Sequence, residues 1–313
     1  MTLRALGQSG LTVSPLALGT WAMGGHVPTW GFVDDNESIA TIQKAEDLGI
    51  NLIDTAPIYG NGHAEEIVGK ALRGRRDRWV VATKCGLLPG PDADAPPRRC
   101  LTGTSVIQEC DRSLRRLGVD CIDLYQCHWP DPDTPIRETM EAMVSLQELG
   151  KIRAIGLSNF GCERMAAARE FAAVTVAQIS FSMLNRKGAT DLLPYCAEHG
   201  MGVLVYGPLA KGLLTGKFDQ HSTFTDLRAT DREFSGARLL SNVRKVSRLA
   251  DVAGRGEKTA AQLALNWVMH QPGVTAAIVG AKRPSQIVEN AGAVGWSIPA
   301  DQLAEINRIL EEA

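Results

Sequence analysis

The sequence predicts a (β/α)8 barrel preceded by an N-terminal β-hairpin. Eight short apolar runs alternate with helical patterns, and no linker or low-complexity break interrupts them. Polar residues follow several of these runs, at the strand ends where barrel active sites lie. A doubly wound sheet is the competing fold, but no GxGxxG motif follows the first strand and the glycine-rich loops come late. We therefore expect residues 1–313 to form a single domain, although the length alone would allow two.

The individual elements follow from local patterns. Segments 3–6 and 11–14 flank a glycine-rich turn and predict the hairpin. The expected barrel strands are residues 16–18, 51–54, 79–84, 121–127, 152–157, 176–179, 203–206 and 276–279. The expected helices are near residues 39–48, 65–72, 105–117, 134–149, 162–171, 191–199 and 240–270, from 284 onward, and at 299–311.

Helix boundaries are indicated by capping residues. Gly49, Gly74, Gly118 and Gly150 stand where a left-handed stop is expected. Ser105 with Gln108 is typical of a capping box, and Thr134-Pro135 is typical of an N-cap followed by a proline at the first helical position. Pro284 should begin another helix in the same way.

Composition limits the possible partners. The chain has 33 basic and 35 acidic residues, so its net charge of -2 favours neither a nucleic acid nor a membrane surface. The N-terminus has no apolar signal core, and no stretch reaches the roughly 18 apolar residues of a membrane span. We expect a cytoplasmic enzyme of ordinary soluble composition.

Seven cysteines, an odd number without CxxC spacing, indicate reduced thiols. Cys85 and Cys127 flank Lys84 and His128, so a reactive or metal-binding role is the alternative for them. Metal-ligand spacing is missing, and we expect no metal site.

Four polar residues at the ends of three strands predict proton chemistry. Asp54, Lys84 and His128 end their strands, and Tyr59 follows Asp54 across a turn. A lysine ammonium near Tyr59 should lower the pKa of its phenol, and Asp54 should keep Lys84 charged. His128 can donate a hydrogen bond to a carbonyl oxygen that gains negative charge. The set suits protonation of a developing alkoxide.

Each of these residues also has a plainer interpretation. Asp54 could form a turn, Lys84 could be a solvated strand end, and His128 before Trp129 could be a packed loop histidine. The chemistry of the residues taken alone leaves these readings open.

Several longer motifs resemble the aldo-keto reductase family, of the bacterial branch that includes sugar and short-chain aldehyde reductases. They are the opening 6–21 segment, the 54–60 and 65–72 segments, the sequence Ile155-Gly156-Leu157-Ser158-Asn159-Phe160, and the glycine-containing 207–217 segment. The resemblance covers nearly the whole chain and implies an NADPH-dependent reductase of aldehydes or ketones, such as small aldehydes, dicarbonyls or aldoses. It implies that Tyr59 is the general acid, tuned by Lys84 and Asp54, with His128 orienting the carbonyl; the reverse alcohol oxidation would use the same groups.

The resemblance also implies a set of cofactor contacts. Ser158, Asn159 and Gln178 should hold the nicotinamide carboxamide, Tyr206 should stack on the ring, and the 207–217 loop should wrap the pyrophosphate. A basic pair before a helix N-terminus, Lys282-Arg283, suits a 2′-phosphate and favours NADPH over NADH. The expected cofactor-binding residues are Gly19, Thr20, Trp21, Asp54, Ser158, Asn159, Gln178, Tyr206, Gly207, Pro208, Leu209, Ala210, Gly212, Leu214, Lys217, Gly280, Lys282, Arg283, Gln286, Glu289 and Asn290.

Two of these assignments have structural alternatives, because Tyr206 could be barrel core and Lys282-Arg283 could be a solvated pair. The expected substrate-binding residues are Trp21, Trp30, Tyr59, His128 and Trp129, since aromatic walls suit small carbonyls. Loops 22–35, 86–104 and 216–240 should shape the substrate site. The family commonly has serine where this chain has Ala64, which removes an expected N-cap and leaves Gly62 or His63 as substitutes.

Two other functions compete with the reductase. Lys84 at a barrel strand end could form a Schiff base in an aldolase or lyase, although a lysine paired with Asp54 stays charged and non-nucleophilic. Some relatives of this fold serve as regulatory subunits of potassium channels that bind cofactor with slow chemistry. Such a subunit should bind NADPH tightly without appreciable turnover.

Overall fold

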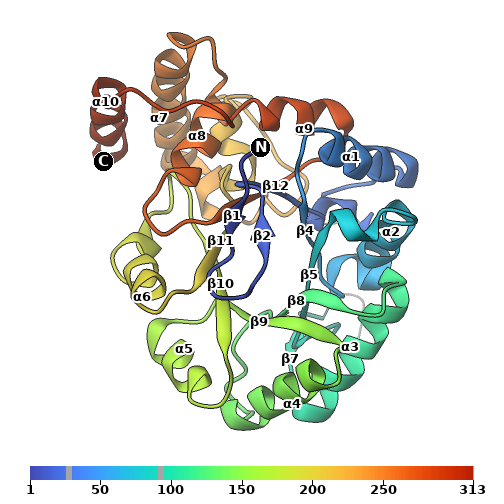
Figure 1. The fold of residues 1–313 in the computed structure, drawn as a ribbon. Coiled ribbons are helices and arrows are strands. Elements are labelled where there is room, and N and C mark those ends of the chain that lie inside the picture. The colour runs from blue at the N-terminus through green and yellow to red at the C-terminus, as the bar shows by residue number, and fades with distance from the viewer. Residues whose placement is uncertain (26–29, 91–94, 313) are drawn as a thin grey trace.

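The computed structural model, which describes residues 1–25, 30–90 and 95–312, confirms the predicted (β/α)8 barrel and hairpin. Eight parallel strands close in the order β10-β11-β12-β3-β4-β5-β8-β9, and helices surround them (Figure 1). The barrel strands are β3 (Leu16–Gly19), β4 (Leu52–Asp54), β5 (Val80–Cys85), β8 (Ile122–Cys127), β9 (Ile152–Ser158), β10 (Val174–Ser180), β11 (Gly202–Tyr206) and β12 (Ala276–Gly280). Nearly all their residues are buried, because one face fills the barrel and the other packs against helices.

The N-terminal hairpin covers one end of the barrel. Strands β1 (Arg4–Ala5) and β2 (Thr12–Val13) pair antiparallel, and Figure 1 shows them lying across the barrel opening. Leu6, Leu11 and Val13 belong to the same buried cluster as the interior side chains of the barrel strands. Burial of these apolar side chains holds the hairpin against the barrel.

The helices form the outer layer and share a second, larger core with the outward-facing strand residues. They are α1 (Asp35–Asp47), α2 (His63–Ala71), α3 (Gly103–Leu117), α4 (Ile136–Glu148), α5 (Cys162–Arg169), α6 (Leu192–Glu198), α7 (Gly236–Gly254), α8 (Ala260–Met269), α9 (Pro284–Ala291) and α10 (Ala300–Glu311). The expected single helical region 240–270 is thus two helices. α8 is buried on nearly all sides, and α7 packs outside it against α10.

Two of the predicted helix caps need correction. Thr102, not Ser105, caps α3, and its hydroxyl accepts the Ser105 N–H. Thr134 does not cap α4, because its hydroxyl donates to Asp131 and Pro135 takes the cap position. At α2 the N-cap is Gly62, one of the two expected substitutes for a serine; it makes no side-chain bond, and Ala64 lies inside the helix. A full capping box does occur at Thr259 of α8.

Loop 86–104 contains a short antiparallel pair that the sequence did not predict. Strands β6 (Leu87–Leu88) and β7 (Arg98–Arg99) pair next to the end of β5. Residues 26–29 and 91–94 of the expected substrate loops lie outside the described residues.

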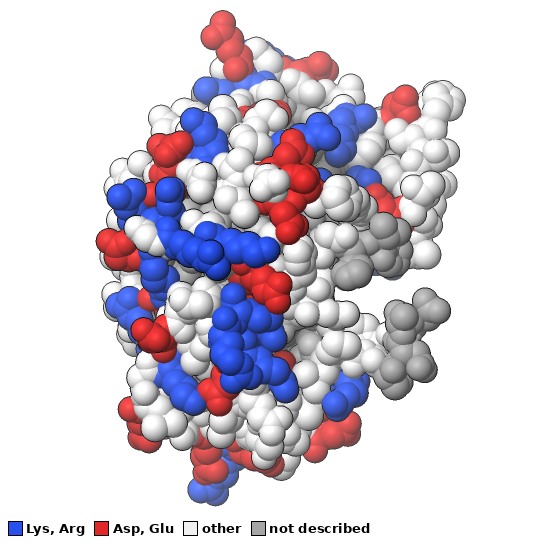
Figure 2. All heavy atoms as spheres, turned by 90° about the vertical axis from the view of Figure 1, so that its right-hand side faces the viewer, with Lys and Arg blue, Asp and Glu red and all other residues white. Residues whose placement is uncertain are grey.

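Surface charge is mixed. Figure 2 shows the face formed by α1, α2 and α3, where basic side chains gather at the centre and acidic ones lie among them. Several arginines of the turn after α2 are paired: Arg75 and Arg78 contact Glu46 at 3.4 and 2.7 Å, and Arg76 contacts Asp123 at 2.6 Å. The charges of these arginines are therefore balanced within the fold.

The seven cysteines are free thiols, as expected. No cluster of three or more metal-ligating side chains occurs among residues 1–25, 30–90 and 95–312. In the same described ranges, none of the helices has the length and apolarity needed to cross a membrane.

Candidate active site

Three neighbouring strands bring Asp54, Lys84 and His128 to one rim of the barrel. Asp54 ends β4, Lys84 is the penultimate residue of β5, and His128 directly follows β8. These strands are consecutive in the barrel, and all run in the same direction. The side chains therefore meet at the carboxyl ends of the strands.

Asp54 and Lys84 form a buried ion pair. The Lys84 Nζ lies 2.6 Å from Asp54 Oδ1 and donates a second hydrogen bond to the Thr55 carbonyl at 2.9 Å. Burial lowers the pKa of Lys84, but the carboxylate of Asp54 and the phenol of Tyr59 outweigh it, so the net pKa is raised. Lys84 is therefore held as an ammonium.

Two glutamines complete the surroundings of Asp54. Gln178 of β10 donates to Asp54 Oδ2 at 2.8 Å, and Gln126 of β8 donates to the same oxygen at 3.3 Å. Gln178 was expected at the nicotinamide, whereas in this structure its amide contacts the carboxylate. Gln126 was not predicted. One signal in the sequence could have found Gln126. It is a polar residue in a mostly apolar strand, and it lies two residues after Leu124, so both side chains point into the barrel.

Tyr59 is positioned by two short 3₁₀ segments. Trp21–Gly24 and Tyr59–Gly62 pack backbone to backbone, and a Cβ on Gly60 would lie 2.1 Å from the Gly24 carbonyl oxygen. Only glycine fits this contact, since Gly60 also has φ 60°. The packing places the Tyr59 ring centroid 5.3 Å from the Lys84 Nζ and 6.0 Å from the centroid of the His128 ring.

The pKa of Tyr59 departs from the expectation. Burial raises it, Lys84 lowers it as predicted, and Asp54 raises it again. The net pKa is raised, opposite to the expected lowering. The reason is that burial of the phenol outweighs the effect of the ammonium, which the paired carboxylate of Asp54 also partly cancels.

His128 is buried and neutral. Burial lowers its pKa well below the usual range, and the nearby Lys84 ammonium lowers it further. A neutral imidazole keeps one N–H to donate and cannot act as a cation at neutral pH. Its backbone is held on both sides, because its N–H donates to the Cys85 carbonyl at 2.9 Å and its carbonyl accepts from Asn159 Nδ2 at 2.9 Å.

Asn159 connects four strand ends. It follows β9 with a left-handed φ of 65°, and its N–H donates to the Gln178 carbonyl of β10 at 3.1 Å. Its side-chain amide contacts the carbonyl of His128, and its Oδ1 accepts the Tyr206 hydroxyl at 2.7 Å. A non-glycine residue in this conformation is strained, and the three hydrogen bonds to Gln178, His128 and Tyr206 hold it there.

The expected cofactor residues, apart from Asp54 on β4, occupy the neighbouring arc of the rim. Strands β9 to β12 and β3 are consecutive in the barrel and adjoin the arc of β4, β5 and β8. On these strands lie Gly19, Ser158, Gln178, Tyr206 and Gly280. In the following loops or α9 lie Thr20, Trp21, Asn159, Gly207, Pro208, Leu209, Ala210, Gly212, Leu214, Lys217, Lys282, Arg283, Gln286, Glu289 and Asn290.

Positive charge gathers on this arc. Burial lowers the pKa values of Lys217 and Lys282, and the neighbouring Arg228 lowers both further. Arg228 itself pairs with Asp226, at 2.9 Å from its Nε, and lies over the rings of Trp30, Phe218 and Phe224. Sequence reasoning missed Arg228, because only the folded loop brings it to Lys217 and Lys282.

Aromatic side chains stand beside Tyr59. Trp21 is 41% exposed, lies 6.3 Å from the Tyr59 ring and packs edge-on against Trp30 at 5.3 Å. Trp129 instead packs under Arg99, whose guanidinium lies 5.3 Å from its ring. Trp21 and Trp30 therefore form one wall next to Tyr59, and Trp129 belongs to the side of the β6–β7 pair.

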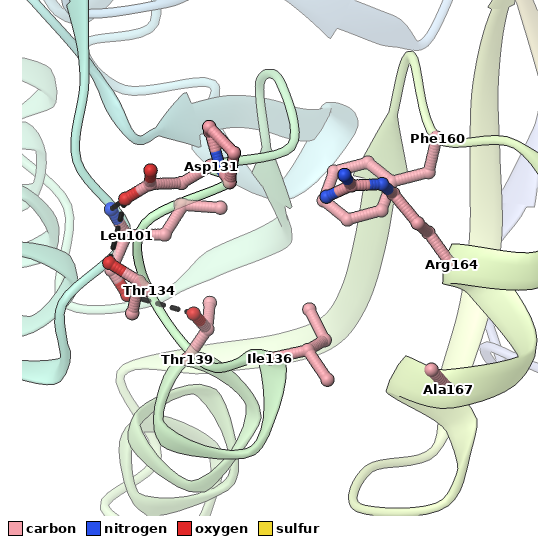
Figure 3. A pocket seen from close by; sticks show the side chains of 9 residues that line it. Leu101, Asp131, Thr134, Ile136, Thr139, Phe160, Arg164 and Ala167 are labelled. Carbon is pink, nitrogen blue, oxygen red and sulfur yellow. Dashed lines mark hydrogen bonds between the residues drawn. The ribbon is translucent and has the colours of Figure 1, made fainter.

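A separate cavity of about 170 Å³ lies between α4 and α5, outside the barrel. Figure 3 shows Asp131 hydrogen-bonded to Leu101 and Thr134 on one side and Phe160 with Arg164 on the other. None of the predicted site residues lines it. The carboxylate of Asp131 accepts hydrogen bonds from Leu101, Asp133 and Thr134, so its contacts hold the local loop together.

Comparison with known proteins gives a consistent result. The profile of the Aldo/keto reductase family matches residues 15–311. The aldo-keto reductase YhdN of Bacillus subtilis is 41% identical over 99% of this chain and 94% of its own length. The NADH-specific methylglyoxal reductase of Escherichia coli is 36% identical over 98% of both chains, and a probable voltage-gated potassium channel subunit beta of Arabidopsis thaliana is 35% identical over 94% of this chain and 91% of its own. The structure of the glycerol dehydrogenase AKR11B4 from Gluconobacter oxydans superposes with a TM-score of 0.91 at 40% identity, covering 99% of this chain and 94% of that chain.

Proposed function

Because the chain belongs to the aldo/keto reductase family, we propose that it is an NADPH-dependent oxidoreductase that reduces aldehydes or ketones to alcohols. The observation that carries this proposal is the buried Asp54–Lys84 pair beside Tyr59, together with a neutral His128 whose ring centroid lies 6.0 Å from that of Tyr59. These groups can deliver a proton and a hydrogen bond to the same carbonyl oxygen.

Tyr59 is the proposed general acid. Lys84 stabilises the phenolate that remains after the proton leaves, because its ammonium lies 5.3 Å from the ring centroid. Asp54 holds that ammonium in place through a 2.6 Å contact. A phenol with a raised pKa remains protonated at neutral pH and is ready to donate.

His128 is the proposed donor that orients the carbonyl. As a neutral imidazole it presents one N–H, and its backbone is fixed at both its N–H and its carbonyl. A fixed donor aimed at the developing oxyanion lowers the barrier without reorganisation.

The chain's residues fit a nicotinamide dinucleotide. Lys217, Arg228 and Lys282 share the carboxylate of Asp226, and Arg283 beside them lies 3.7 Å from Glu37. Four cations facing these two carboxylates leave an excess of positive charge for phosphates. When bound, the cofactor supplies the hydride. Ser158, Asn159, Gln178 and Tyr206 would hold its nicotinamide end, and the 207–217 loop with α9 would hold the rest. The cation excess supports NADPH, although the methylglyoxal reductase of Escherichia coli is NADH-specific.

Small carbonyl compounds are the proposed substrates. Two of the relatives are named for methylglyoxal and glycerol, which are small and polar. The tryptophan wall of Trp21 and Trp30 beside Tyr59 suits small aldehydes, dicarbonyls or aldoses. Seven thiols without a disulfide support a cytoplasmic location.

The proposal is tested by following NADPH oxidation with small aldehydes, methylglyoxal, aldoses and aromatic aldehydes. Tyr59→Phe should retain NADPH affinity and lose roughly 100-fold or more in kcat, because the proton donor is gone. Tyr195→Phe is the matched control, since Tyr195 stacks on His199 and lies outside the predicted site residues. Undiminished turnover in Tyr59→Phe would show that Tyr59 is not the general acid.

The potassium-channel relative favours one alternative, a cofactor-binding regulatory subunit. Tight NADPH binding with no turnover across the panel would support it over the reductase. A Schiff-base lyase is disfavoured, because the raised pKa of Lys84 keeps its amine protonated. Borohydride trapping of substrate on Lys84 would support the Schiff-base lyase instead.

A further inference from the structure

One peptide bond lies between two of the proposed site residues. Cys85 directly follows Lys84, and its carbonyl accepts the backbone N–H of His128 at 2.9 Å. The N–H of the same peptide belongs to Gly86 and donates to both carboxylate oxygens of Glu109, at 3.1 and 3.2 Å. The Cys85–Gly86 peptide therefore joins Lys84, His128 and Glu109.

Glu109 reaches this peptide from outside the barrel wall. It lies on α3, which packs against β5, and only 2% of its surface is exposed. The Ser105 hydroxyl, one turn earlier on the same helix, donates to Glu109 Oε1 at 3.0 Å. The carboxylate is thus held by its own helix and directed at the end of β5.

The peptide has little freedom to move. Gly86 has φ 84°, and a Cβ there would lie 2.2 Å from the Leu101 side chain. Its carbonyl accepts the Cys100 N–H at 3.2 Å. The turn that carries the peptide is therefore defined by Leu101 and Cys100 on one side and by Glu109 on the other.

We propose that Glu109 is a positioning residue that fixes Lys84 and His128 relative to each other through the Cys85–Gly86 peptide. The inference rests on the proposed reductase function and deepens it. Neither substrate nor cofactor needs to touch Glu109, because it acts on the backbone that carries both side chains.

The carboxyl group of Glu109 is buried, and burial is unfavourable for its charged form. Burial raises its pKa to about 6, against the lowering effects of the Gly86 N–H, Ser105 and Arg112. The other titratable groups facing it are Glu65 of α2, Cys85 of β5 and Tyr125 of β8. A buried acid with a raised pKa destabilises the fold at neutral pH, so a contact such as the Gly86 bond must offset that cost.

A second buried carboxylate serves as the comparison. Asp123 of β8 also accepts a backbone N–H of β5, from Val81 at 2.9 Å, and it pairs with Arg76 and Arg153. Val81 lies near the opposite end of β5, away from Lys84. Asp123→Asn should therefore weaken the fold without disturbing the site.

The test compares Glu109→Ala, Glu109→Gln and Asp123→Asn with the wild type, using NADPH and the best carbonyl of the panel. Glu109→Ala should lower kcat roughly 10- to 100-fold with NADPH affinity unchanged, because a small misplacement of reacting groups costs that much. Glu109→Gln should restore kcat to within about threefold, since its amide oxygen can accept the Gly86 N–H. Asp123→Asn should keep kcat within about twofold while its melting temperature falls.

Backbone hydrogen exchange gives a readout that does not depend on turnover. The His128 amide should exchange faster in Glu109→Ala than in the wild type or Asp123→Asn, because its acceptor peptide is released. If Glu109→Ala does not fold, Glu109→Asp, which is one methylene too short to reach Gly86, replaces it.

Two results would overturn the inference: unchanged kcat and exchange in Glu109→Ala, or a loss in that variant that Asp123→Asn reproduces in full. Absence of turnover in the wild type would instead reject the proposed function. The exchange of the His128 amide would then still decide whether Glu109 positions the peptide.

Discussion

Lys84 and Lys282 lie on the same rim, but their neighbours act on their charges in opposite ways. Lys84 is fully buried, yet its charge is stabilised because Asp54 and the Thr55 carbonyl take its hydrogen bonds. Lys282 has the opposite surroundings, since burial and the cations Arg228 and Lys217 lower its pKa. The first charge is already neutralised by the protein, whereas the second gains from an incoming anion.

Lys282→Ala should therefore weaken NADPH binding about 10-fold and leave NADH binding within about twofold, since a charge-assisted bond to a phosphate is lost. Equilibrium titration with both cofactors measures the difference. Arg255→Ala is the control, because Arg255 pairs with Glu305 on α7 and α10 away from the rim. Equal weakening of both cofactors would contradict a 2′-phosphate contact at Lys282.

The positions of residues could be predicted where they depend on local sequence, and not where they depend on packing. The meeting of Asp54, Lys84 and His128 at one rim was predicted because each directly ends an apolar run, and their roles in catalysis stay predictions. Gln126 and Glu109 were missed, since their partners, the Asp54 carboxylate and the Gly86 N–H, come from distant segments. The rise of the Tyr59 pKa was also missed, because burial outweighs the neighbouring charge.

At the scale of elements, two 3₁₀ segments determine where the proposed acid stands. Neither was expected, because each spans only four residues and lies in what reads as loop. Sequence patterns found all eight strands and the main helices, but shifted several helix starts. Thr102 and Pro135 took the cap positions expected for Ser105 and Thr134. A residue caps a helix through its side chain only if that side chain can accept a backbone N–H of the first turn, and other contacts decide this.

Gly60→Ala should lower the free energy of unfolding by about 2–5 kcal/mol, because it combines an unfavourable backbone conformation with a collision against Gly24. Gly74→Ala is matched in conformation, at φ 74°, but its Cβ would meet open space. That control should lose only about 1–2 kcal/mol. Urea unfolding gives both values, and equal losses would show that the Gly24 contact is unimportant.

At the scale of the whole molecule, two buried groups give opposite pH dependences of stability. The pKa of Glu109 is raised to about 6 from 4.5, so the fold prefers its protonated form. Its contribution is fully present below pH 4.5 and is lost as the pH rises through 6. The pKa of His128 is lowered, so its contribution is present above its usual value and is lost as the pH falls.

Glu109→Gln should remove the contribution of Glu109 to the pH dependence of stability. The stability of this variant relative to the wild type should increase by about 1.5 kcal/mol between pH 4.5 and 6.5, because most of the raised-pKa contribution of Glu109 is lost by the wild type over this range. Urea unfolding at several pH values measures it. A difference between the two proteins that does not change with pH would show that the carboxyl does not titrate in this range.

The hairpin of β1 and β2 has a consequence for ligand access. Because Leu6, Leu11 and Val13 cover the N-terminal end of the barrel and strand side chains fill its interior, the strand ends can be reached only from the opposite rim. For the proposed reductase, cofactor and carbonyl substrate would therefore approach from the same side, and the molecule that sits deeper would bind first and leave last.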